Sequence, residues 1–131
     1  MLQNTNSQIL RDRTKRFALL VIRCCHAIPR NEESRIICRQ LLRSATSVAA
    51  NYRAVCRARS SADFISKMGI VLEEADESLF WLELLVESGV VAHEKLGHLL
   101  KESDELVSIF VASLRTVKGI GDHTAPNVRA H

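Results

Sequence analysis

The residues best suited to chemistry are basic side chains gathered on and around one predicted helix. Arg35, Arg39 and Arg43 recur at four-residue steps, which places them in a ladder along one helical face. Further basic residues lie at the far end of that helix and earlier in the chain: Arg53, Arg57, Arg59, Lys15 and Arg16. Guanidinium and ammonium groups in such numbers can bind the phosphates of a nucleic-acid backbone. These eight residues form our candidate nucleic-acid-binding site.

An ion-pair interpretation of the same arginines competes with this hypothesis. Residues 60–88 hold seven acidic side chains against Lys67 alone, whereas residues 30–59 hold seven basic and two acidic ones. The net charge of the chain is only +3, which is a weak electrostatic attraction for a nucleic acid. The single tyrosine, Tyr52, falls among core positions, so aromatic stacking on bases is poorly supported. On residues alone, pairing of the arginines with the acidic stretch is favoured.

Catalytic chemistry has little support in the sequence. A di-metal carboxylate bundle needs Glu-x-x-His on two helices, and this spacing does not occur. Glu94, His98 and Glu102 share a helical face, but the apolar seam of that helix lies on another side, so we expect the face to be solvated. We therefore expect a protein that is not an enzyme and has no catalytic residue, metal site or cofactor. A metal-dependent enzyme stays the least favoured alternative.

The elements that must position these residues are helices. The chain has 131 residues, is 47% apolar and contains only two prolines and five glycines, which indicates one helical domain. Apolar residues recur at three- and four-residue steps in four segments, at about residues 7–28, 32–57, 61–88 and 92–117. Short connections force antiparallel neighbours, so we expect an all-α, antiparallel up-down-up-down four-helix bundle over residues 1–118. Residues 119–131 are expected to be a disordered tail.

Local signals set the predicted helix ends. Pro29 cannot continue the first helix, and Asn31 is a suitable N-cap for the second. Ser60 and Asp63 have the spacing of a capping box, which starts the third helix. Ser88 and Gly89 provide a C-terminal signal for that helix.

The apolar faces are wider than one bundle needs. The fourth helix carries a seam at alternating four- and three-residue steps: Leu96, Leu100, Ser103, Val107, Phe110, Leu114 and Val117. The third helix is apolar nearly all round near Phe80, Trp81 and Leu84, which indicates either a central position or a subunit contact. Asn51 and Tyr52 lie on inward stripes of the second helix, and we assign them a structural or oligomer-forming role.

The remaining composition indicates a cytoplasmic protein without a membrane segment. The first twelve residues are polar rather than signal-like, and charged residues interrupt every apolar run before the ~20 residues of a bilayer span. The four cysteines are Cys24, Cys25, Cys38 and Cys56, with no Cys-x-x-C pair. We expect them to be reduced and buried as small apolar residues.

A motif spread over the second helix and the start of the third resembles a known family. Its residues are Gln40-Leu41-Leu42-Arg43-Ser44-Ala45, Ser47-Val48, Asn51, Arg59-Ser60 and Asp63-Phe64. The pattern is similar to that of small bacterial four-helix-bundle proteins encoded in intervening sequences of 23S ribosomal RNA genes. The accessory variability determinant proteins of diversity-generating retroelements are related to them. The likeness covers about Phe17 to Val117.

This resemblance implies an assembly and a class of partner. It implies a homopentamer, a ring of bundles that would cover the over-wide apolar faces. In the retroelement branch it implies binding of RNA and a reverse transcriptase through a basic surface. We therefore predict a homo-oligomeric binding or scaffold module with RNA as its ligand. The alternative is a purely structural oligomer without nucleic-acid binding.

Overall fold

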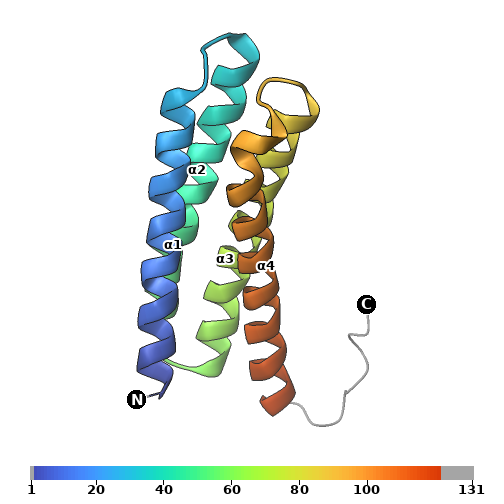
Figure 1. The fold of residues 1–131 in the computed structure, drawn as a ribbon. Coiled ribbons are helices and arrows are strands. Elements are labelled where there is room, and N and C mark those ends of the chain that lie inside the picture. Colours follow the sequence, from blue (N-terminus) through green and yellow to red (C-terminus); the bar gives the residue numbers. More distant parts are fainter. Residues whose placement is uncertain (1, 122–131) are drawn as a thin grey trace.

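The structure is a computed structural model that describes residues 2–121. Its elements are α1 (Leu2–Ala27), α2 (Glu32–Val55), α3 (Ser61–Glu87) and α4 (His93–Gly121). No strand occurs among these described residues, so the predicted all-α four-helix bundle is confirmed. Figure 1 shows the N-terminus and the α2–α3 connection at one end of the bundle, and the other two connections at the opposite end.

Two of the predicted helix starts have the expected caps. The Asn31 side chain accepts a hydrogen bond from the Ser34 backbone N–H at 2.8 Å, and the Ser34 hydroxyl accepts one from the Asn31 N–H at 2.9 Å. Ser60 accepts from the Asp63 N–H at 3.0 Å. The Asp63 carboxylate, however, accepts from the Arg59 N–H rather than from the N–H of Ser60. Each cap satisfies backbone donors that a helix start would otherwise leave without a partner.

The outer helix boundaries differ from the prediction. α1 begins at Leu2 rather than near residue 7, because neither proline nor glycine interrupts the first residues. α4 continues through Gly119 to Gly121, beyond the end predicted near residue 117. Gly119 costs a helix about 1 kcal/mol relative to alanine, and glycine often ends a helix by adopting a left-handed backbone with a positive φ. Among the described residues only Gly89 has such a positive φ, 83°, and it follows α3 as predicted. The tail predicted for 122–131 lies outside the described residues.

The closest helix pair is α2 and α3. α2 also packs against α1, and α3 against α4, whereas α1 and α4 share few contacts. Small residues line the α2–α3 contact: Ser44, Ala45, Ala75 and Ser78 are all buried. The hydroxyl of Ser78 donates to that of Ser44 at 2.8 Å, and Ser44 Oγ lies 3.2 Å from the Leu41 carbonyl oxygen. The buried hydroxyls are thereby satisfied, and the two backbones approach closely.

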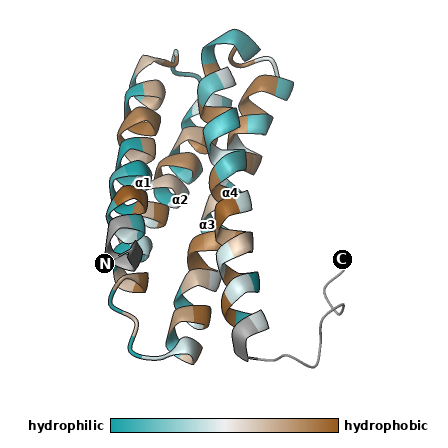
Figure 2. Cartoon of the chain, turned by 60° about the horizontal axis from the view of Figure 1, so that its bottom comes forward, coloured by the Kyte–Doolittle hydropathy of each residue, from teal (hydrophilic) through white to brown (hydrophobic). Residues whose placement is uncertain are grey.

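The core runs through the middle of all four helices. Phe17, Tyr52 and Phe110 are buried, and the rings of Tyr52 and Phe110 stack with centroids 6.0 Å apart. The seam of α4 is partly shifted from the predicted one, because Leu99 and Leu106 are buried where Leu100 and Val107 are only half-buried. Figure 2 shows that every helix carries both hydrophobic and hydrophilic residues. None of the described helices has a stretch long and apolar enough to cross a membrane.

We expect the substitution Ser44→Leu to lower the free energy of unfolding by about 1–3 kcal/mol, because three carbons must take the place of one hydroxyl oxygen at a fully buried contact between α2 and α3. Thr46→Leu, two residues away on the exposed side of α2, should change it by no more than about 0.5 kcal/mol. Urea unfolding followed by circular dichroism measures both values. Equal effects of the two substitutions would contradict close packing at Ser44.

Candidate nucleic-acid interface

A groove between α1 and α2 brings several basic side chains together, and we call it the basic groove. Its charged members are Arg11, Lys15, Arg53 and Arg57, together with Asp12. Small or neutral residues form the rest of its lining: Gln8, Thr46, Ala49, Ala50 and Ala54. Four cations against one carboxylate give the groove a net charge of +3. No aromatic residue lines it, so its walls offer charge rather than stacking surfaces.

A second hollow continues the basic groove at the α2–α3 connection. Arg57 belongs to both hollows, and Arg59, Asp63 and Lys67 complete the charged lining of the second. Lys67 donates to the Asp63 carboxylate at 2.9 Å, and this bond is the largest cause of the lowered pKa of Asp63. Asp63 is therefore already neutralised within its own helix, which leaves Arg57 and Arg59 as the excess charge.

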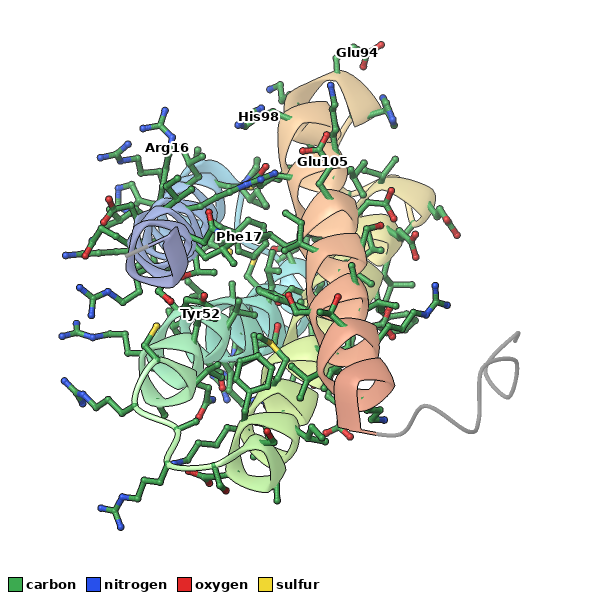
Figure 3. All side chains as sticks on the ribbon, turned by 90° about the horizontal axis from the view of Figure 1, so that it is seen from below. Arg16, Phe17, Tyr52, Glu94, His98 and Glu105 are labelled. Atoms are coloured by element: carbon green, nitrogen blue, oxygen red, sulfur yellow. The ribbon has the colours of Figure 1, made fainter. Side chains whose placement is uncertain are left out.

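The eight predicted nucleic-acid-binding residues divide into separate groups. Lys15, Arg53, Arg57 and Arg59 line the two joined hollows. The ladder of Arg35, Arg39 and Arg43 lies nearer the start of α2, with Arg35 about 27 Å from Arg53 along the helix axis. Arg16 is exposed, and Figure 3 shows its side chain pointing away from the bundle.

Only one of these eight cations is in an ion pair within the part of the chain that the structure describes. The Arg43 guanidinium contacts the Glu74 carboxylate at 3.3 Å and also pairs with Glu77. The ion-pair interpretation therefore holds at Arg43, and it does not extend to Arg35 or Arg39 in a single copy.

Two residues of this surface were missed at the level of sequence. Arg11 lines the basic groove and Lys67 lines the adjoining hollow. Arg11 precedes Lys15 by four residues, so the same spacing that revealed the α2 ladder could have identified it. Lys67 carried no comparable signal, because only the turn between α2 and α3 brings it near Arg57.

The predicted solvation of this α4 face holds at Glu94 and His98, which are exposed, but not at Glu102. Arg13 of α1 donates to both carboxylate oxygens of Glu102 and to Glu105, at 2.7–2.9 Å. The Glu102 side chain is only 17% exposed. Figure 3 shows Glu105 extending from α4 toward α1, while Glu94 and His98 lie further along the same helix. These contacts tie together the helix pair that otherwise packs least.

The residues assigned a structural or oligomer-forming role have distinct environments. Tyr52 is buried in the core, whereas the Asn51 amide is half-buried and donates to the Ser47 carbonyl and hydroxyl oxygens within α2. Phe80, 49% exposed, packs its ring edge-to-face with Trp81, with centroids 4.8 Å apart. Leu84 follows Phe80 by one helical turn and is half-buried. An apolar cluster thus remains partly open to solvent on the outer side of α3.

A polar network borders this cluster on the side of α2. The Trp81 indole N–H donates to the Glu77 carboxylate at 3.0 Å, and Arg43 binds the same carboxylate. The bonds from Trp81 and then from Arg43 hold the pKa of Glu77 below its usual range. This network links Trp81 of α3, through Glu77, to Arg43 of α2.

Burial holds the thiols of Cys24 and Cys25 in their neutral form. Cys38 is buried, while Cys24, Cys25 and Cys56 are half-buried, so burial is less complete than predicted. Burial raises the pKa of Cys24 to about 11, and it raises that of Cys25 further. Among the described residues, no group of three or more His, Cys, Asp or Glu side chains could hold a metal ion.

Comparison with known proteins identifies the family. Residues 6–112 match the model of a family described as 23S rRNA-intervening sequence protein. The chain belongs to this family. No curated protein sequence matches it.

A solved structure supports the same assignment for the fold. It is the crystal structure of a protein of unknown function from the S23 ribosomal protein family of Bacteroides thetaiotaomicron. The two chains are 30% identical and superpose with a TM-score of 0.74, over 80% of this chain and 97% of that one. The family resemblance predicted from the α2 motif is therefore confirmed.

The stability of this family member should fall at alkaline pH partly through Tyr52. Burial raises the pKa of Tyr52 from 10.0 to about 12, so the fold favours the neutral phenol. Its contribution, on the order of 2 kcal/mol, is complete below pH 10 and is lost as the pH rises toward 12. Because Tyr52 is the only tyrosine, phenolate absorbance reports on this site alone.

The substitution Tyr52→Phe provides the control for this prediction. Between pH 10 and 12 the wild type should lose more unfolding free energy than the variant, which lacks the phenol. Urea unfolding at several pH values measures the difference. Parallel pH profiles would show that the Tyr52 phenol titrates as if it were exposed.

Proposed function

We propose that this chain is a non-enzymatic, homo-oligomeric binding module of the cytoplasm, and that its ligand is RNA. The observation that carries the proposal is the basic groove, where Lys15, Arg53 and Arg57 converge from two helices. Among the described residues, none of these three cations is consumed by an ion pair. A phosphate backbone is the polyanion that such a groove fits.

The lining of the groove also supports a mode of binding. Besides its cations it presents alanine and threonine side chains, which provide neither aromatic stacking nor an array of base-reading amides. The RNA is therefore held through its phosphates with little dependence on base sequence. The name of the family, which refers to intervening sequences of 23S ribosomal RNA, is consistent with an RNA ligand.

Self-association is the second part of the proposal. We propose that antiparallel up-down-up-down bundles assemble as a homopentamer, as the family resemblance implies. Phe80, Trp81 and Leu84 leave apolar surface partly open on α3, and self-association would cover it. A reverse transcriptase, the partner implied by the retroelement branch, remains a further candidate partner of the assembled form.

A purely structural oligomer is the alternative function. The contact of Arg43 with Glu74 and Glu77 favours it, because it shows that arginines of α2 can be neutralised by α3. Contacts between copies could neutralise Arg35 and Arg39 in the same manner. Loss of assembly on replacing Arg35, Arg39 and Arg43 by alanine would favour this alternative.

We expect the double substitution Arg53→Ala and Arg57→Ala to weaken RNA binding and its salt dependence. Removing two phosphate contacts should reduce the slope of log affinity against log salt concentration by about 1–2. Fluorescence anisotropy with a structured RNA, measured over a series of salt concentrations, gives both affinity and slope. Light scattering on the same samples reports whether assembly is intact.

The matched control is the double substitution Arg35→Ala and Arg39→Ala, which removes the same charge from the same helix outside the groove. It should leave the salt slope nearer to that of the wild type. An equal loss for both variants would show that general charge, and not the groove, attracts RNA. Wild-type protein that binds no structured RNA at low salt would refute the proposed function.

A further inference from the structure

Two exposed apolar side chains lie at the centres of oppositely charged surfaces. On α1, Leu19 is 43% exposed and Ile22, one turn further on, is 44% exposed. Residues three, four or seven positions before or after Leu19 share its side of the helix. The charged ones among them are Asp12, Lys15, Arg16, Arg23 and His26. With histidine neutral, the net charge of these side chains is +2. We call Leu19, Ile22 and these neighbours the α1 face.

On α3 the corresponding centre is Phe80. The charged side chains three, four and seven residues from Phe80 are Glu73, Asp76, Glu77, Glu83 and Glu87. Their net charge is −5, and no basic residue is among them. We call Phe80, Leu84 and these acids the α3 face.

These charges are largely unused within one copy. In the part of the chain that the structure describes, Arg16, Arg23 and Lys15 form no ion pair, and of the five acids only Glu77 does. α1 and α3 are diagonal in the bundle, and neither packs against the other, so the two faces cannot meet within a copy. The charge separation along the sequence therefore remains in the folded chain.

The two faces also match in height along the bundle. Leu19 lies eight residues before the end of α1 and Phe80 seven before the end of α3, which are axial distances of about 12 Å and about 10 Å. Figure 1 shows that α1 and α3 end at the same end of the bundle. Arg23 and Glu83 each lie four residues before those ends, so opposite charges fall at equal heights.

We infer that the α3 face of one copy docks on the α1 face of a second copy, head to tail. This inference rests on the proposed self-association and names the surfaces that produce it. Phe80 and Leu84 pack against Leu19 and Ile22, and the surrounding carboxylates face the guanidinium groups of Arg16 and Arg23. Apolar centres within complementary charge favour this pairing and disfavour contact between like faces.

The test uses two variants that each lose one face. Leu19→Asp places a carboxylate opposite the acidic α3 face, and Phe80→Asp puts a charge where an aromatic ring should pack. Each variant alone should have the mass of a single copy by light scattering, whereas the wild type is oligomeric. Mixed in equal amounts, they retain one intact pair of faces, so a particle of two copies should form and grow no further.

The matched control is Ile9→Asp, because Ile9 is 56% exposed on α1 outside the docking face. It should keep the wild-type mass, and circular dichroism must show the same helix content in all variants. Leu19→Asp and Phe80→Asp proteins that keep the wild-type mass, or that stay as single copies when mixed, would overturn the pairing of these faces. A wild type with the mass of one copy would instead refute self-association itself.

Discussion

The close approach of α2 to α3 is the constraint on which the rest of the structure depends. Ser44, Ala45, Ala75 and Ser78 are small enough for the two backbones to meet, and the Ser44–Ser78 hydrogen bond satisfies the hydroxyls that this approach buries. Because α2 is held between α1 and α3, its opposite face remains outside the core. That face carries the arginines that define the chemistry of the surface.

The placement of charge follows from this arrangement. Arg43 lies beside α3 and is neutralised there, whereas Arg53 and Arg57 share the α1–α2 groove with Lys15 and Arg11, where Asp12 is the single carboxylate. α1 is tied to α4 by Arg13 and its two glutamates, which leaves its other cations directed outward. The bundle thus keeps a basic and an acidic surface apart, and both a polyanion and a second copy of the chain could use that separation.

Much of the fold was predictable because it depends on local signals. The caps at Asn31 and Ser60 and the left-handed Gly89 are consequences of side-chain size and hydrogen bonding within a few residues. Predictions of which side of a helix faces the core were less accurate. The spacing of α4 allowed either Leu99 or Leu100 to face the core, and only packing against the other helices selects Leu99. The partner of Asn51, which the sequence left open, is Ser47 one turn earlier in the same helix.

The sequence by itself determined the helices, the bundle and the family, because periodicity, caps and a linear motif are properties of neighbouring residues. It also located the basic and acidic segments, since charge can be counted without a structure. Only the tertiary structure decided which cations are neutralised. Arg43 and Arg53 are both exposed arginines on α2, but their partners lie on different helices and are set by the rotation and register of packed elements. A contact between residues distant in sequence depends on how whole helices pack, and local spacing does not encode that arrangement.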